Sequence, residues 1–171
     1  MSEIKKSERK ESKLETVHNA YKIRTAVTKL AENNFYFDLN KINEVVEQNT
    51  KNIVDEKLRE KAKKRIYQYF NNQIERITNK VINTACEINE HLRIANTIFP
   101  TYMSEFEERR LELDKAMSCC NVLQDELQYA GECLYADLNK YTALVLEIQK
   151  EFNMIKKLRQ TDNRFLKDMK K

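Results

Sequence analysis

Residues 58–99 read LREKAKKRIYQYFNNQIERITNKVINTACEINEHLRIANTIF and contain neither glycine nor proline. Apolar residues recur along this stretch in steps of three and four, which is the spacing of one face of an α-helix. They are Leu58, Ala62, Ile66, Phe70, Ile74, Ile77, Val81, Ala85, Ile88, Leu92, Ala95 and Phe99. The stretch therefore predicts one helix of about 40 residues, roughly 60 Å long, with a coiled-coil-like apolar stripe.

The rest of the chain has the same character, because its 171 residues include one glycine, Gly131, and one proline, Pro100. Folds with phosphate-binding glycine loops need several glycines at fixed spacing, and all-β folds need frequent turns. The composition excludes both classes. Pro100 disfavours helix in the residue before it, so it is expected to end the long helix.

A first helix is predicted from about Lys13 to Glu32, after a polar tail at residues 1–12. Its apolar side comprises Leu14, Val17, Ala20, Tyr21, Val27 and Ala31. The aromatic run at residues 35–37 is too apolar for a free loop, so we expect it to pack back on the helices. Asp38 or Asn40 is then expected to cap a further helical stretch.

Beyond Pro100, the sequence Ser-Glu-Phe-Glu at residues 104–107 matches a capping box and predicts the start of a third helix. This helix is expected to end near Gly131, and Asp137 to cap a fourth helix. Four amphipathic helices with short connections predict an all-α fold, an up-down-up-down antiparallel four-helix bundle over residues 13–171 with a long second helix.

Charge and cysteine content limit the setting of the protein. The formal net charge is +4 and the pI is about 8.8, which permits an anionic partner without requiring one. No segment approaches the roughly 20 apolar residues of a membrane span, and the N-terminal residues lack the apolar core of a secretory signal. We therefore expect a cytoplasmic protein with no membrane partner. Its cysteines are then thiols, and Cys86, Cys120 and Cys133 are expected to be small buried apolar residues.

The sequence offers little for catalysis. Di-metal helical bundles use two Glu-x-x-His motifs, and Glu15-Thr-Val-His18 matches only once. Before His91, Ile88 stands where the second glutamate would be needed, whereas Glu87 is spaced to pair with His91. We expect no metal, no cofactor and no enzymatic activity.

The sharpest signal lies near the C-terminus. Seven basic residues fit within an arc of roughly 160° on a helical wheel. They are Lys156, Lys157, Arg159, Arg164, Lys167, Lys170 and Lys171, and both Asp162 and Asp168 fall outside the arc. The pattern predicts an anion-binding face, for which nucleic acid is the favoured ligand. Two alternatives stay open, namely cations that complement the helix dipole and a tail without fixed structure.

Two further basic groups are secondary candidates for nucleic-acid binding. Lys63, Lys64 and Arg65 precede Tyr67, Tyr69 and Phe70, and basic residues beside aromatic ones can bind single strands. A solvated helix explains the same charges, because they spread around the helix. Arg109 and Arg110 form the second group, and pairing with Glu105, Glu107 or Glu108 is an equal alternative for them.

Three short stretches are familiar: KLETVHNAY at residues 13–21, DLNKY at 137–141 and RQTDNRF at 159–165. With the four-helix layout, they resemble the Avd-like four-helix-bundle proteins, accessory variability proteins encoded beside reverse transcriptases in diversity-generating retroelements. The resemblance implies a non-enzymatic protein that assembles as a pentameric barrel. It also implies a basic surface for template RNA and contact with the reverse transcriptase during mutagenic cDNA synthesis.

The chain is longer than is usual for that family, and the excess lies mainly between Asn33 and Gln73 and at both ends. Our hypothesis is a homo-oligomeric accessory protein that binds template RNA or cDNA together with a reverse transcriptase. The alternative is a helical adaptor that binds proteins and no nucleic acid, because the long apolar stripe suits a partner helix as well as an internal core.

Overall fold

The structure is a computed structural model that describes residues 6–167, with side chains from residue 15 onward. These residues form five α-helices: α1 (Lys6–Glu32), α2 (Leu39–Thr50), α3 (Glu56–Thr97), α4 (Met103–Leu134) and α5 (Thr142–Thr161). Three short 3-10 helices accompany them: η1 (Asn34–Tyr36), η2 (Leu138–Lys140) and η3 (Asp162–Lys167). Within residues 6–167 there is no β-strand, only an isolated bridge between Phe37 and Ala136. The predicted all-α class is confirmed.

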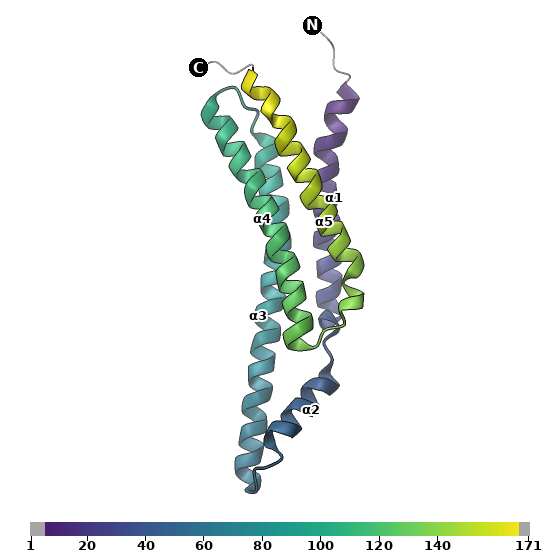
Figure 1. Ribbon diagram of the computed structural model, residues 1–171, viewed down its shortest axis with the longest axis vertical. Coiled ribbons are helices and arrows are strands. Elements are labelled where there is room, and N and C mark those ends of the chain that lie inside the picture. Colours follow the sequence, from purple (N-terminus) through teal and green to yellow (C-terminus); the bar gives the residue numbers. More distant parts are fainter. Residues whose placement is uncertain (1–5, 168–171) are drawn as a thin grey trace.

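Four of the helices lie side by side (Figure 1), with α3 and α5 each in contact with both α1 and α4. The N-terminal part of α3 extends beyond α4 and α5, and α2 folds back along it. We call this projection, residues 39–67, the α2–α3 hairpin. The sequence predicted a long helix in this region but not that its first part would stand clear of the other helices.

Most of the predicted stripe of α3 lies in the core. Its buried members are Phe70, Ile77, Val81, Ala85, Ile88, Leu92 and Ala95. The two ends of the stripe were predicted wrongly, because Leu58 is 59% exposed on the hairpin and Phe99 is 68% exposed after the end of α3. Tyr21 is also exposed, and Ile23 and Leu30 fill the core from α1 instead.

The structure confirms some of the predicted helix starts and differs at others. Asp38 caps α2, since its Oδ1 accepts hydrogen bonds from the backbone N–H groups of the first turn, which confirms one of the two predicted caps. Asp137 caps η2, and α5 begins only at Thr142. Helix α1 begins at Lys6 rather than near Lys13, because the charged residues before Lys13 have adequate helix propensity.

Both ends of α4 differ from the prediction. The Glu105 carboxylate accepts a hydrogen bond from the Tyr102 backbone N–H at 3.0 Å, so the capping motif begins at Tyr102 and not at Ser104. Gly131 lies inside the helix, and the left-handed residue that ends it is Tyr135, with φ of 58°. A tyrosine in this conformation is strained, so tertiary contacts rather than glycine freedom end this helix.

The connection between α1 and α2 is the most strained backbone in the described chain. Asn34, Phe35 and Tyr36 all have positive φ, at 46°, 52° and 52°, and each such residue costs roughly 1–2 kcal/mol. The segment is held from the α4–α5 connection, where the Tyr141 hydroxyl donates to the Phe35 carbonyl at 2.5 Å and the Asp137 N–H donates to that of Tyr36 at 3.3 Å. Phe35 is fully buried, which confirms that the aromatic run packs back on the helices.

One carboxylate lies inside the core. Glu151 of α5 is fully buried and accepts a hydrogen bond from the Asn19 Nδ2 of α1 at 2.7 Å. Its Oε1 has no hydrogen-bond partner among the described residues. Burial raises the pKa of Glu151 to about 7, and the Asn19 bond offsets only part of this effect.

This burial makes the stability of the fold depend on pH. Because the pKa of Glu151 is higher in the folded than in the unfolded state, its contribution is most favourable below pH 4.5 and decreases as the pH rises to about 7. We predict that Glu151→Gln raises the free energy of unfolding at pH 8 by about 3 kcal/mol and changes it little at pH 4.5. Urea unfolding at the two pH values measures this difference.

The control is Glu147→Gln, which removes an exposed carboxylate one turn earlier on α5. It should leave the pH dependence of stability almost unchanged. A stability gain for Glu151→Gln that is equal at both pH values would contradict the raised pKa.

Candidate nucleic-acid interface

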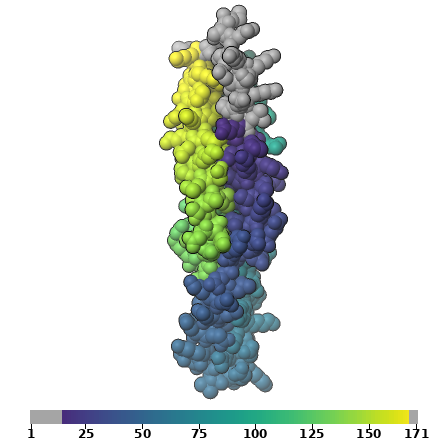
Figure 2. All heavy atoms as spheres, turned by 90° about the vertical axis from the view of Figure 1, so that its right-hand side faces the viewer, coloured from purple at the N-terminus to yellow at the C-terminus, as the bar shows by residue number. Residues whose placement is uncertain are grey.

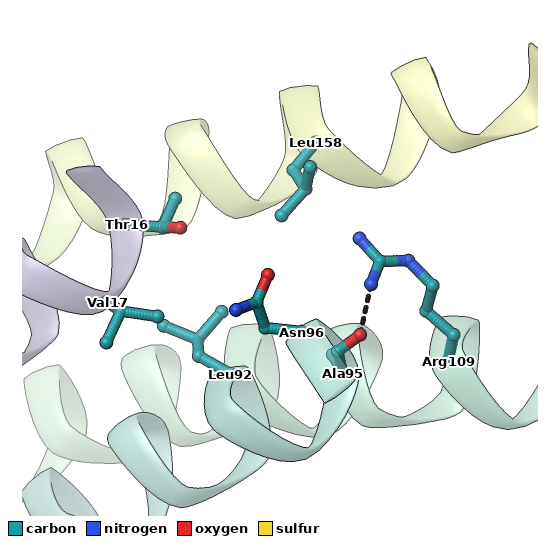
Figure 3. A pocket seen from close by; sticks show the side chains of 7 residues that line it. All are labelled: Thr16, Val17, Leu92, Ala95, Asn96, Arg109 and Leu158. Atoms are coloured by element: carbon teal, nitrogen blue, oxygen red, sulfur yellow. Dashed lines mark hydrogen bonds between the residues drawn. The ribbon is translucent and has the colours of Figure 1, made fainter. Parts of the chain in front are cut away.

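Arg109, a predicted RNA contact, is buried instead and ties three segments together. Its Nε donates to Asp162 Oδ2 at 2.5 Å, while its Nη1 donates to the carbonyls of Ala95 and Ile98. Figure 3 shows the guanidinium bonded to the Ala95 carbonyl beside a small pocket lined by α1, α3, α4 and α5. With 1% of its surface exposed, Arg109 cannot contact a ligand, and its assignment to the nucleic-acid site was wrong.

The contact is an internal clamp between the end of α3 and the end of α5. It supplies hydrogen bonds to carbonyls that lack partners at the C-terminus of α3. It also neutralises Asp162, of which only 3% is exposed. A charge buried at such a place requires a partner, and the pairing with the nearby glutamates of α4 that the sequence left open does not occur.

We predict that Arg109→Met lowers the free energy of unfolding by roughly 3–5 kcal/mol, because it leaves the Asp162 charge buried without its partner. Arg110→Met is the matched control on the next residue, which is partly exposed, and should cost less than about 1 kcal/mol. Thermal unfolding of both variants measures the difference. Equal losses would contradict the assignment of Arg109 as a clamp.

Beyond the exposed Glu147, the outer surface of α5 and η3 carries basic side chains without exposed acidic ones. Between residues 148 and 167, the acidic residues are Glu151 and Asp162, and both are buried. The exposed basic side chains there are Lys150, Lys156, Lys157, Arg164 and Lys167. The sequence prediction of a cationic face therefore agrees with the exposure of these residues, whereas Lys170 and Lys171 lie outside the described range.

Helix α1 extends this surface. Residues 16–31 contain no acidic residue, and the exposed Lys22 and Lys29 lie three and ten positions after Asn19, which faces α5. This spacing places both lysines on the side of α1 toward α5, together with the exposed Glu15 four positions before Asn19. Figure 2 shows α1 and α5 adjacent on one face of the molecule. We call the exposed basic residues of these two helices and η3 the α1/α5 face.

The sequence reasoning missed Lys22, Lys29 and Lys150, although the lack of acidic residues at 16–31 was visible in it. Lys150 lies 3.9 Å from the Glu147 carboxylate, so part of its charge is compensated. Helix α4 is the opposite case, because its acidic residues outnumber its basic ones. The resulting field favours approach of an anion to the α1/α5 face.

Three predicted arginines have partners. Arg159 pairs with Asp114 of α4, with 2.5 Å between Nε and Oδ1. Arg110 donates to Asn163 at 3.3 Å and lies over the Phe106 ring. Arg164 is exposed and lies over the Phe165 ring, 5.1 Å from its centroid. Arg159 is therefore a weaker candidate for phosphate contact than the lysines beside it, while Arg164 keeps its charge available.

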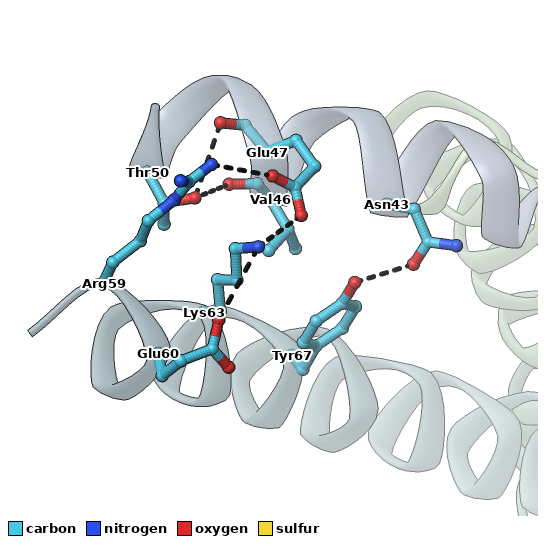
Figure 4. A network of polar contacts seen from close by, with 8 residues as sticks. All are labelled: Asn43, Val46, Glu47, Thr50, Arg59, Glu60, Lys63 and Tyr67. Carbon is cyan, nitrogen blue, oxygen red and sulfur yellow. Dashed lines mark hydrogen bonds and ion pairs between the residues drawn. The ribbon is translucent and has the colours of Figure 1, made fainter. Parts of the chain in front are cut away.

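The secondary basic group lies on the hairpin. Lys63 lies 2.6 Å from the Glu47 carboxylate of α2, and Arg59 lies 3.3 Å from it, as Figure 4 shows. Tyr67 donates to Asn43 at 2.9 Å in the same network. Lys63 and Tyr67 thus hold α2 against α3. Lys64 and Arg65 are exposed and remain candidates.

Two of the thiols, Cys119 and Cys120, lie at least partly buried in the interior. Burial raises the pKa of Cys119 to about 11 and that of Cys120 further, so neither is an activated nucleophile. Cys120 is buried as expected, Cys86 partly so, and Cys133 is exposed, contrary to the prediction.

His91 pairs with Glu112 of α4 at 2.6 Å instead of with Glu87. Burial opposes ionisation of Glu112, but bonds from Lys115 and His91 outweigh it and lower its pKa. Within the described part of the chain, no cluster of three His, Cys, Asp or Glu residues could hold a metal ion.

No helix among residues 6–167 has the combined length and apolarity required to cross a bilayer. Comparison with protein-family models, curated proteins and solved structures finds no match to this chain.

Proposed function

We propose that this protein is a non-catalytic RNA-binding accessory protein of the cytoplasm. We further propose that α1, α3, α4 and α5 form an antiparallel up-down-up-down four-helix bundle that presents the α1/α5 face to the RNA. The observation that supports RNA binding best is the outer surface of residues 148–167, where both acidic residues are buried and all the basic ones except Arg159 are exposed.

The mechanism is electrostatic. Lys156, Lys157, Arg164 and Lys167 make no ion pair with described residues, so their charges are available to phosphates. Each phosphate contact releases condensed counterions from the RNA, which drives binding and makes it weaker at high salt. Such contacts position a strand without reading its sequence.

The partner and the assembly follow from the resemblance to Avd-like proteins. We propose that the chain forms a homo-oligomer, a pentamer in that family, and works with a reverse transcriptase during cDNA synthesis. A ring of subunits repeats the α1/α5 face, so that many weak phosphate contacts add up to stable binding. The α2–α3 hairpin falls in the region where this chain is longer than that family, so the contact between subunits need not be the same.

The first test replaces Lys156, Lys157, Arg164 and Lys167 by glutamine. We expect weaker binding of a labelled single-stranded RNA and a salt dependence whose slope falls by up to about 0.7 for each phosphate that is no longer neutralised. Fluorescence anisotropy at several salt concentrations measures both quantities, and circular dichroism should show unchanged helicity.

The control removes the same charge from the hairpin, by glutamine at Lys41, Lys51, Lys57 and Lys61, which are all exposed and are not candidates for nucleic-acid binding. This variant should retain most of the affinity. An equal loss of RNA affinity in both variants would show that only the net charge matters and would contradict a specific α1/α5 face. If the unmodified protein does not bind RNA at physiological salt, the result would favour the protein-binding adaptor.

A further inference from the structure

Aromatic side chains gather where α3 turns into α4 and meets η3. Phe99 and Tyr102, on the turn, are 68% and 60% exposed. The Phe99 ring contacts Phe165 of η3 edge to face, with 5.6 Å between the ring centroids. This contact places an exposed ring at the C-terminal end of the α1/α5 face. We call Phe99, Tyr102 and Phe165 the aromatic end.

The Phe99 ring is held in place by the buried clamp. Arg109 donates to the carbonyl of Ile98, the residue before Phe99, at 3.1 Å, and to Asp162, which begins η3. Both backbone segments that carry the two rings are thus fixed to one guanidinium. An exposed ring that is already ordered loses little entropy when a flat ligand binds to it.

Positive charge lies beside these rings on the η3 side. Arg164 lies over the Phe165 ring, and Lys167 is exposed on the same short helix. Arg110 lies over the neighbouring Phe106 ring, 5.9 Å from the centroid. Rings for stacking beside cations for phosphates are the combination that binds unpaired nucleotides.

We propose that the aromatic end binds an unpaired base of single-stranded RNA by stacking on Phe99, with Arg164 and Lys167 on the flanking phosphates. This inference rests on the proposed RNA-binding function and specifies its ligand. A base within a duplex has both faces covered, so a ring on a turn cannot stack on it. The exposed Glu107 and Glu108 repel phosphates on the α4 side, so the strand runs from Phe99 along η3 and α5.

Phe99→Ala in the full chain tests this assignment. The probes are a labelled, unstructured 10-nucleotide RNA and the same strand in a duplex. We expect the variant to bind the single strand about 5- to 150-fold more weakly, the loss of one stacked base. Duplex affinity and the salt dependence of binding should not change, because no phosphate contact is removed. Phe99→Trp should retain the affinity for the single strand.

Tyr21→Ala is the matched control, because Tyr21 is an aromatic residue of similar exposure on α1, away from the turn. It should bind both RNAs as the unmodified protein does. Equal affinity of Phe99→Ala and the unmodified protein for the single strand would overturn the inference while leaving the proposed function intact. An equal loss of affinity for the single strand and the duplex would also overturn the inference. A lower particle mass of Phe99→Ala by light scattering would overturn it too, because it would assign the aromatic end to a contact between subunits.

Discussion

The arrangement of this protein depends on the buried ion pair between Arg109 and Asp162. These residues are 53 positions apart, and their contact joins α4 to the end of α5. The same guanidinium donates to the carbonyls of Ala95 and Ile98, so one side chain bonds both a helix terminus and one oxygen of a buried carboxylate. The Arg109 Nη2 and the Asp162 Oδ1 have no hydrogen-bond partner among the described residues, so the contact fixes the segments it joins while leaving two buried polar atoms unsatisfied.

The clamp also explains how a mildly basic chain presents a strongly basic surface. The acidic residues of the described range 148–167, Glu151 and Asp162, are buried, where Glu151 bonds Asn19 and Asp162 bonds Arg109. The lysines on the same helix have no equivalent internal partner among the described residues and stay in the solvent. The net charge of +4 understates the positive charge of the α1/α5 face, because many acidic side chains lie on α4.

The periodicity of apolar residues was sufficient to predict the helices and most core positions. A residue such as Ile77 or Ile88 lies on the apolar stripe of its helix whichever helix packs against it. Periodicity could not separate Arg109 from Arg110, since their different fates depend on a partner distant in the sequence. Periodicity also could not show that α3 extends beyond the helices packed against it and that Leu58 is therefore exposed. Glu151 was detectable in principle, because it lies between Ile148 and Ile155 on the inner side of α5.

The continuity of α3 has a mechanical consequence. This helix of 42 residues runs without interruption from the tip of the hairpin to the clamp, about 63 Å at the usual rise. The tip of the hairpin therefore has no hinge within α3. A lateral force on the tip acts as a torque on the whole of α3, and α2 can follow that movement only if the chain bends at the left-handed segment, residues 34–36.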